Sequence, residues 1–362
     1  MFLIDPIRKF YGRFERPISS LSLIGGFVFD AITLQRVDTL WENIWVFAHL
    51  LIVATFIYLI HIHEAGEGDE NNPEKAHFWY VNILQFFFGG ILSTYLVFYF
   101  RSADILVTWP FILILAIAFI ANESLKRHYM RLSFQLSLFF LSVYSFAIFL
   151  VPVLIHQIGT KIFLLSGLFS LVFISIYISL LFFLIRRKSN LKKKLVFYLI
   201  AGILALVNIL YFTNLIPPIP LSLKDAGVYH SIRKNYDGNY AVQYEDLGFA
   251  SYFQLYQNFK ETPSSKVYAF SAVFSPSSLN ITVIHELQHY NEAIKKWIVE
   301  NIVRLPVTGG RGDGFRTYSF GTNLDAGKWR VNIKTLQGQT IGRLRFNIVM
   351  VDTEPQLSTD VK

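Results

Sequence analysis

The hydrophobic pattern divides the chain into two halves of different texture. Long apolar runs with few charges fill the first 215 residues, whereas from residue 222 onward short runs alternate with turn residues. A helix needs about 20 apolar residues to cross roughly 30 Å of hydrocarbon. Six runs approach or exceed that length, and they predict membrane-spanning helices at residues 41–62, 77–100, 104–121, 132–155, 161–185 and 195–213.

A weaker apolar run, Ile18–Gln35, decides the topology because Asp30 interrupts it. Basic residues gather in three segments, which lie before this run, in Lys126–Arg131 and in Arg186–Lys194. If Ile18–Gln35 spans the bilayer, all three segments lie on one side, which the positive-inside rule makes cytoplasmic. We therefore expect seven spans in the cytoplasmic (inner) membrane, a cytoplasmic N-terminus and an extracytoplasmic, periplasmic C-terminal domain.

Alternation of apolar and charged residues predicts β-strands in the C-terminal half. Residues 329–334 and 343–350 each present one apolar and one charged face, and the turn Gln337-Gly338 lies between them. Such half-buried antiparallel strands are typical of a β-sandwich. Asp237-Gly238 predicts a further hairpin. Aromatic residues at helical spacing in 249–259 indicate either a short helix on the membrane surface or a segment that packs on the domain.

The sequence thus predicts an α-helical membrane bundle of about seven transmembrane helices, followed by a C-terminal all-β, sandwich-like (immunoglobulin-like) domain. Its segments are a basic cytoplasmic N-terminus (1–17), a transmembrane helical domain (18–213), a linker with a hairpin and an aromatic juxtamembrane segment (214–262), the β-sandwich (263–353) and a C-terminal tail (354–362). The shift in hydrophobic pattern near residue 215 marks the main boundary.

Composition supports a membrane protein and excludes several kinds of site. Hydrophobic residues make up 53% of the chain and charged residues only 16%, against roughly 25% charged residues in soluble domains. The basic residues behind the net charge of +8 concentrate in short loops between apolar runs. They indicate positive-inside sorting and the lipid bilayer as a partner, not nucleic acid. The chain has no cysteine, which excludes disulfides, thiolate metal sites and cysteine nucleophiles.

A potential metal motif lies in residues 281–290, ITVIHELQHY. His285-Glu286-Leu287-Gln288-His289 matches the H-E-x-x-H of zinc peptidases, in which two histidines on one helical face bind Zn and the glutamate activates a water. One hypothesis is therefore a membrane-anchored zinc metallopeptidase, with Glu286 as its catalytic residue and His285 and His289 as metal ligands.

The same segment favours a strand over a helix, because its lead-in Ile281–Ile284 is rich in β-branched residues. On a strand, His285 and His289 would lie about 13 Å apart on one face, too far to share a zinc ion, and Glu286 would point the other way. No third ligand extends the motif, since the position three past His289 is Glu292. We therefore expect a sandwich strand here, with no catalytic residue, metal or other cofactor.

The glycine-rich segment Gly309–Gly314 offers candidates for ligand binding. Its backbone amides, together with Arg311 or Arg316, would suit an anion. A solvated loop with structural arginines is the simpler interpretation. Tyr318 and Trp329 complete the ligand-binding candidates of the C-terminal half.

The membrane half offers three polar candidates, Asp30, Arg36 and Asp38, in or beside the first apolar run. A carboxylate buried in a membrane is either functional or paired locally, and one carboxylate makes no proton relay. The apolar runs also lack the paired glycine- or proline-broken helices of transporters, so transport is a distant alternative.

Three motifs stand out in the C-terminal half. They are Gly309-Gly-Arg-Gly-Asp-Gly-Phe-Arg-Thr-Tyr-Ser319, Asn323-Leu-Asp-Ala-Gly-Lys-Trp-Arg-Val331 and Gly338-Gln-Thr-Ile-Gly-Arg343. Together they resemble a bacterial family catalogued as domain of unknown function 2914, over about residues 263–351. The membrane half, with its Gly26–Asp38 run, also resembles members that carry this domain behind membrane helices.

The resemblance implies a strand at His285 and an envelope location, but no reaction, because the family has no established activity or ligand. Two positions depart from the family pattern. Ala269 stands where a cysteine is expected, and Glu286-Leu287 replaces a basic-then-aromatic pair, which creates the H-E-x-x-H string.

Two functional hypotheses from different classes follow. The first is a non-catalytic envelope protein whose β-sandwich, on the outer side of the membrane, binds or scaffolds a protein, peptide or glycan partner. The second is the zinc peptidase. The incomplete catalytic set and the strand-like lead-in favour the first.

Overall fold

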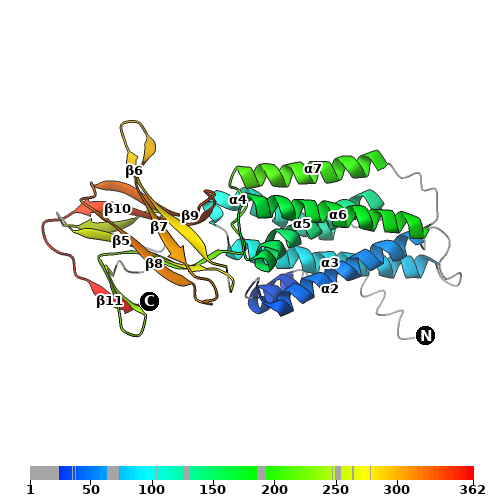
Figure 1. Ribbon diagram of the computed structural model, residues 1–362, viewed down its shortest axis with the longest axis horizontal. Helices are drawn as coiled ribbons and strands as arrows, with labels where there is room; N and C mark the ends of the chain where they lie inside the picture. Colours follow the sequence, from blue (N-terminus) through cyan, green and yellow to red (C-terminus); the bar gives the residue numbers. More distant parts are fainter. Residues whose placement is uncertain are drawn as a thin grey trace. The chain divides into compact units, whose positions relative to one another are not determined.

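The computed structural model describes residues 24–34, 36, 38–62, 73–102, 104–124, 131–185, 193–246, 248, 254–262, 265–277 and 279–362. The chain forms two compact units, one of Met1–Phe100 and Trp109–Leu215 and the other of Arg101–Thr108 and Ile216–Lys362. The first unit is helical and the second is rich in β-strands (Figure 1).

Six helices of the described chain are long and apolar enough to cross a membrane. They are α2 (Leu40–Ile62), α3 (Pro73–Arg101), α4 (Ile105–Ser124), α5 (Leu132–Ile155), α6 (Thr160–Ile185) and α7 (Lys193–Phe212). Their positions confirm the six long apolar helices that the hydrophobic pattern predicts. A shorter apolar helix, Ile24–Thr33, occupies part of the weaker run Ile18–Gln35. The first residues of that run and the basic segments 1–17 and 186–192 lie outside the described residues.

Helix α5 forms the centre of the helical unit. It contacts α2, α6 and α7, and most of its side chains, such as Phe139, are buried. Its polar side chains are satisfied inside the bundle, since the Ser142 hydroxyl donates to the Leu138 carbonyl and the Tyr95 hydroxyl donates to the Ser142 carbonyl. An unpaired polar group in hydrocarbon costs several kcal/mol, so these hydrogen bonds make serine-containing helices compatible with a membrane.

The second unit contains three β-sheets (Figure 1). The strand order is β4-β10-β9-β6-β7 in a five-stranded sheet, β1-β5-β8 in a three-stranded sheet and β11-β3-β2 in a small sheet. The strands are β1 (Ser222–Tyr229), β2 (Ser231–Lys234), β3 (Tyr240–Tyr244), β4 (Gln257–Glu261), β5 (Lys266–Phe274), β6 (Ile281–Asn291), β7 (Lys296–Val307), β8 (Phe315–Thr322), β9 (Gly327–Thr335), β10 (Thr340–Met350) and β11 (Ser358–Val361).

The five-stranded and three-stranded sheets pack face to face as a sandwich. Their shared core contains Ala269 of β5, Trp329 and Val331 of β9, and Phe346 of β10. Because side chains alternate along a strand, each strand gives every second residue to this core. Strands β9 and β10 pair antiparallel, with Val331 opposite Leu344 and Trp329 opposite Phe346, which confirms the strand pair predicted from the alternating pattern.

The small sheet covers part of the outer face of the three-stranded sheet. Tyr229, Ile232, Val242 and Phe270 form a second apolar cluster between these two layers. Strands β2 and β3 pair antiparallel around Asp237-Gly238, where Gly238 has φ +83°, so the predicted hairpin is confirmed. A positive φ of this size favours glycine, because it lacks a Cβ.

The aromatic segment 249–259 ends in a strand instead of continuing at helical spacing. Phe259 on β4 is buried in the sandwich core, and β4 pairs in parallel with β10; residues 249–253 lie outside the described part of the chain. The β-rich unit begins at Ile216 and also includes β1 to β4 and β11. Pairing between strands so distant in sequence leaves no local pattern to read.

Candidate functional site

Strand β6 carries the H-E-x-x-H string, which confirms the strand that the β-branched lead-in predicts. Its neighbour β9 shows which face each side chain takes, because His285 lies opposite Ile333 and Glu286 lies opposite Asn332. Ile333 is fully buried in the sandwich, so His285 points inward and Glu286 points outward. The string is therefore divided between the two faces of one sheet.

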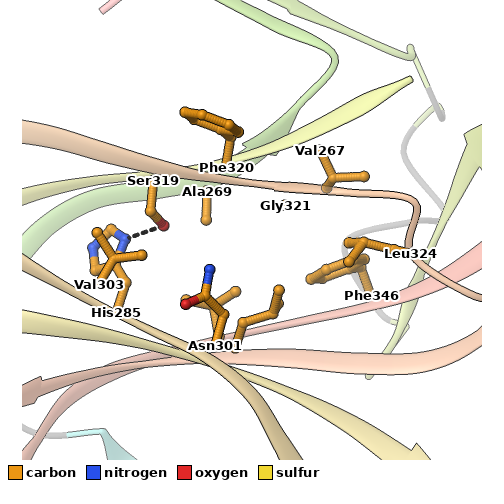
Figure 2. Close-up of a pocket in the computed structure, with 12 residues that line it drawn as sticks. Val267, Ala269, His285, Asn301, Val303, Ser319, Phe320, Gly321, Leu324 and Phe346 are labelled. Carbon is orange, nitrogen blue, oxygen red and sulfur yellow. Dashed lines mark hydrogen bonds between the residues drawn. The ribbon is translucent and has the colours of Figure 1, made fainter. Parts of the chain in front are cut away.

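The inner face of β6 holds a buried network of one imidazole and three hydroxyls. Nε2 of His285 lies 2.8 Å from Oγ of Ser271, and Nδ1 lies 2.9 Å from Oγ of Ser319, the contact drawn in Figure 2. Ser271 Oγ lies 3.0 Å from Oγ1 of Thr317. Ser271 comes from β5 and the other two hydroxyls come from β8, so the network joins the two sheets of the sandwich.

Burial makes His285 a neutral hydrogen-bonding group. It is 1% exposed, and burial lowers its pKa from 6.5 to about 4. A neutral imidazole has one donor nitrogen and one acceptor nitrogen, so it can donate to one serine and accept from the other. A serine and a histidine at this spacing can also act as nucleophile and base. Here Ser271 is fully buried, so the network stabilises the sandwich and does not meet a substrate.

A small cavity adjoins this network (Figure 2). Its volume is about 10 Å³, which is room for about one water molecule. It is lined by Val267, Ala269, His285, Leu287, Asn301, Val303, Ser319, Phe320, Gly321, Leu324, Val331 and Phe346. A space of this size and mostly apolar lining holds no peptide or sugar.

The strand geometry provides no shared zinc site. Both ring nitrogens of His285 face serine hydroxyls, and His289 stacks on Trp329 with ring centroids 4.4 Å apart. Glu286 lies on the opposite face of the sheet from both histidines. Among the described residues, no group of three or more His, Asp or Glu side chains is placed to hold a metal ion. The geometry therefore does not support the zinc peptidase hypothesis.

On the outer face, Glu286 organises a polar platform, which consists of Glu286, Gln288, Asn332 and Lys334. Its Oε1 accepts hydrogen bonds from Lys334 Nζ at 2.6 Å, Gln288 Nε2 at 2.7 Å and Asn332 Nδ2 at 3.0 Å. Burial alone would raise the pKa of Glu286. The hydrogen bonds from Lys334 and Asn332 and the charges of Lys334 and Arg330 outweigh burial, so this pKa lies below its usual value.

The two amides of the platform hold two arginines. Because their nitrogens donate to Glu286, their oxygens are left to accept from other groups. Arg330 Nε donates to Gln288 Oε1, and Arg343 Nε donates to Asn332 Oδ1. The Arg330 guanidinium also lies 4.2 Å from the centroid of the Trp297 ring, in a cation–π contact. The platform therefore anchors each guanidinium through its Nε.

Arg345 joins Arg330 and Arg343 to form an arginine cluster on this face. Arg345 lies directly opposite Arg330 in the β9–β10 ladder, an arrangement that is destabilising for like charges. Burial lowers the pKa of Arg330 to about 10, and the positive charges of Arg343 and Arg345 act in the same direction. The ion pairs of the described residues include none of these three guanidiniums.

Three of the ligand-binding candidates lie in different surroundings. Arg311 is exposed in the loop before β8. Arg316 Nη1 donates to Oδ1 of Asn239 at 2.7 Å, which ties β8 to the β2–β3 hairpin. Trp329 is only 3% exposed and packs in the sandwich core, where its Nε1 donates to the Asp325 carbonyl at 2.8 Å.

Tyr318 belongs to an aromatic surface, which consists of Tyr240, Tyr268, Tyr318 and Phe320. The ring centroids lie 6.0 Å apart for Tyr240 and Tyr318, 6.1 Å for Tyr268 and Tyr318, and 5.8 Å for Tyr268 and Phe320. Lys266 Nζ lies 5.2 Å from the centroid of Phe320. Tyr318 is 36% exposed and Phe320 is 50% exposed, so the surface is open to solvent on the outer face of the three-stranded sheet.

Two of the three polar candidates of the membrane half, Arg36 and Asp38, form a local ion pair. Both carboxylate oxygens of Asp38 accept from Arg36, at 3.0 Å from Nε and 2.7 Å from Nη2. The backbone N–H of Arg36 also donates to Glu42 Oε1 at 3.3 Å. Asp30 lies half-buried on the short helix Ile24–Thr33. The structure therefore pairs Arg36 with Asp38, at the start of α2.

Sequence reasoning identified Arg330, Arg343 and Arg345 only as members of charged strand faces. The available signal was an excess of basic residues at alternate positions of two adjacent strands. It also missed Ser271 and Ser319, because single hydroxyls in apolar strands do not reveal that they face the same histidine.

A comparison with protein families matches the C-terminal region of the chain. Residues 280–348 match a family model described as "Protein of unknown function (DUF2914)". The match extends from the start of β6 into β10 and so includes the polar platform and the arginine cluster. No curated protein matches the chain.

Solved structures show only weak similarity to this chain. A crystal structure of beta-glucosidase from Listeria innocua in complex with gluconolactone is 8% identical, covers 34% of this chain and 16% of its own, and has a TM-score of 0.19. The Pseudomonas fluorescens alkylpurine DNA glycosylase AlkC, bound to DNA containing an abasic site analog, is 8% identical, with coverage of 86% and 99% and a TM-score of 0.23. The chain thus spans about 16% of the glucosidase. Similarity this low does not transfer a fold or an activity.

Proposed function

We propose that this chain is a multi-pass protein of the cytoplasmic membrane that presents its β-sandwich on the outer, periplasmic side as a non-catalytic binding module. Its partner is a protein, peptide or glycan of the envelope, and binding needs neither a metal nor an organic cofactor. Six long apolar helices, and a β-rich unit whose only Ser–His contacts among the described residues are buried in its core, support this proposal. The basic segments of the sequence support a cytoplasmic N-terminus.

The aromatic surface is the observation that carries the binding proposal. Its four rings contact one another edge to face or tilted, and Tyr318 and Phe320 remain substantially exposed. Rings held by neighbouring rings lose little conformational freedom when a partner covers them, and aromatic side chains are enriched at binding hot spots. The tyrosine hydroxyls and Lys266 add polar contacts at the edge of the surface.

The topology can be tested with single cysteines, because the natural chain has none. Gln337→Cys lies in the exposed turn between β9 and β10. Ser189→Cys lies in the basic segment Arg186–Lys194. In intact bacterial spheroplasts, a membrane-impermeant maleimide should label the first variant and should label the second only after lysis. The reverse pattern would show that the β-sandwich lies in the cytoplasm.

Binding can be tested by photocrosslinking from the aromatic surface in living cells. A photoreactive phenylalanine at Tyr318 should give one discrete adduct, and Phe320→Ala should reduce that adduct. The matched control is Tyr236, a fully exposed tyrosine in the β2–β3 turn outside the aromatic surface. Mass spectrometry of the adduct distinguishes a peptide from a glycan. Equal adducts from both positions would refute a specific role for the aromatic surface.

A further inference from the structure

We infer that the outer face of the five-stranded sheet binds a phosphate group through the arginine cluster, Arg330, Arg343 and Arg345. This site is separate from the aromatic surface, which belongs to the three-stranded sheet. A phosphate group is the shared chemistry of an anionic phospholipid headgroup and of a soluble phosphate compound, and the experiment below distinguishes these two sources.

The register of β9 and β10 brings the three arginines together on one face. Arg345 is the direct cross-strand partner of Arg330, and Cβ atoms of such partners lie about 5 Å apart. Arg343 precedes Arg345 by two residues on the same strand, so it shares that face at a spacing of about 7 Å. Three long side chains at these spacings can reach one tetrahedral anion.

The polar platform orients two of the guanidiniums before any ligand arrives. Arg330 and Arg343 each use Nε to donate to a platform amide, and Arg330 is also stacked over Trp297. Within the described residues, no oxygen accepts a hydrogen bond from the Nη atoms of either arginine. The planar fork of a guanidinium matches two oxygens of a phosphate, so the Nη atoms are the donors that such a ligand requires.

The charge balance of this face also favours an anionic ligand. Two acids act on this face: Glu286, whose Oε1 already accepts three hydrogen bonds, including the one from Lys334, and Asp104, whose charge acts on Arg343. These two negative charges stand against the positive charges of Lys334 and the three arginines. The three arginines are half-buried and repel one another. Natural proteins tolerate such local conflicts mainly at functional sites, where a ligand relieves them.

An ordinary solvated face explains these observations less well. Exposed arginines spread apart into water and contribute little to stability. Here Asn332 is 1% exposed and Gln288 is 8% exposed, although both lie on the outer face. Their amides, oriented by Glu286, fix the arginines close together instead of letting them separate.

The test uses the full chain in nanodiscs and measures hydrogen–deuterium exchange of β9 and β10. In one arm, discs of phosphatidylcholine are titrated with inorganic phosphate, against sodium chloride of equal ionic strength. In the other arm, one third of the lipid is phosphatidylglycerol and no phosphate is added. We expect exchange in these strands to slow about threefold in at least one arm. Slowing with inorganic phosphate assigns a soluble ligand, and slowing with phosphatidylglycerol assigns a lipid headgroup.

Variants separate binding at the cluster from general screening of charge. The double variant Arg330→Gln/Arg343→Gln should lose the slowing. Arg304→Gln, which changes an exposed arginine on β7 of the same sheet, should keep it. No slowing in either arm, or slowing that persists in the double variant, would overturn the inference.

A third variant keeps the test decisive if the double variant does not fold. Without any anion, Arg345→Gln should raise the midpoint of thermal unfolding by a few degrees, because it removes the charge opposite Arg330. It should also weaken the slowing by phosphate or phosphatidylglycerol. A lower midpoint together with unchanged slowing would show that Arg345 is a structural residue and would overturn the inference.

Discussion

Acidification should destabilise the β-sandwich through His285. Burial lowers the pKa of this histidine from 6.5 to about 4, so between these values the unfolded chain binds a proton that the folded chain does not. The stability contributed by neutral His285 is therefore complete above about pH 6.5, and it is lost as the pH falls toward 4. A shift of this size corresponds to about 3 kcal/mol in total, and to about 2 kcal/mol of that by pH 5.

The measurement is urea unfolding of the full chain in detergent at pH 7.5 and pH 5, with pulse proteolysis to report the β-rich unit. A loss of about 2 kcal/mol should lower the urea midpoint by about 1 M. The variant His285→Asn removes the titration. It should be less stable than the wild type at pH 7.5 but should lose less stability on acidification. Comparison of the two chains cancels the contributions of other groups, such as His230, whose pKa is also lowered by burial.

A matched control is available on the same strand. His289→Asn leaves the His285 network intact, because His289 contacts the Trp329 ring and none of the network hydroxyls. This variant should therefore lose as much stability as the wild type between pH 7.5 and pH 5. Equal losses between pH 7.5 and pH 5 in the wild type and in His285→Asn would refute the reasoning, since the imidazole would then titrate alike in the folded and unfolded states.

Three further predictions concern the stability of the β-rich unit, measured by the same urea assay unless stated. Burial raises the pKa of Glu261, so the charged carboxylate is disfavoured in the folded state and the stability that Glu261 contributes falls as the pH rises. Glu261→Gln should therefore stabilise the unit at pH 7.5, on the order of 1 kcal/mol. This gain should vanish toward pH 4. Gly309→Ala should destabilise by about 1–3 kcal/mol because its Cβ would clash with the Pro276 carbonyl oxygen, and a cost close to zero would contradict this. Glu286→Gln should cost about 2 kcal/mol of stability, because three donors lose a charged acceptor. Elemental analysis of the wild type should find no stoichiometric zinc. Bound zinc that remains in Glu286→Gln but is lost in His285→Asn would reverse our interpretation of the strand.

Elements defined by local pattern could be predicted from the sequence. The six spans follow from length and hydrophobicity, which a bilayer enforces independently of neighbouring helices. The strand at 281–290 follows from its β-branched lead-in, and the β9–β10 pair follows from strict alternation around Gln337-Gly338. In each case a few consecutive residues carry the whole signal.

Features that depend on distant pairing could not be predicted. Phe259 has helical spacing with its neighbours, but it lies on a strand because β4 pairs with β10, far away in sequence. Likewise, no local pattern shows that Glu286 lies opposite Asn332, and this register decides that the glutamate orients amides for Arg330 and Arg343 instead of activating a water. The chemistry of a side chain on a sheet depends on its cross-strand neighbours.

The alternation of His285 and Glu286 along β6 also fixes how this strand can align during folding. A slip of one residue against β9 would move every side chain of β6 to the other face. Glu286 would then enter the apolar interior without Lys334, and Ser271 and Ser319 would lose their imidazole partner, at a cost of several kcal/mol. Misalignment of β6 is therefore excluded. Its neighbour β7 is an edge strand with exposed Ile298, Val299 and Ile302, and such a strand would otherwise tolerate wrong pairings.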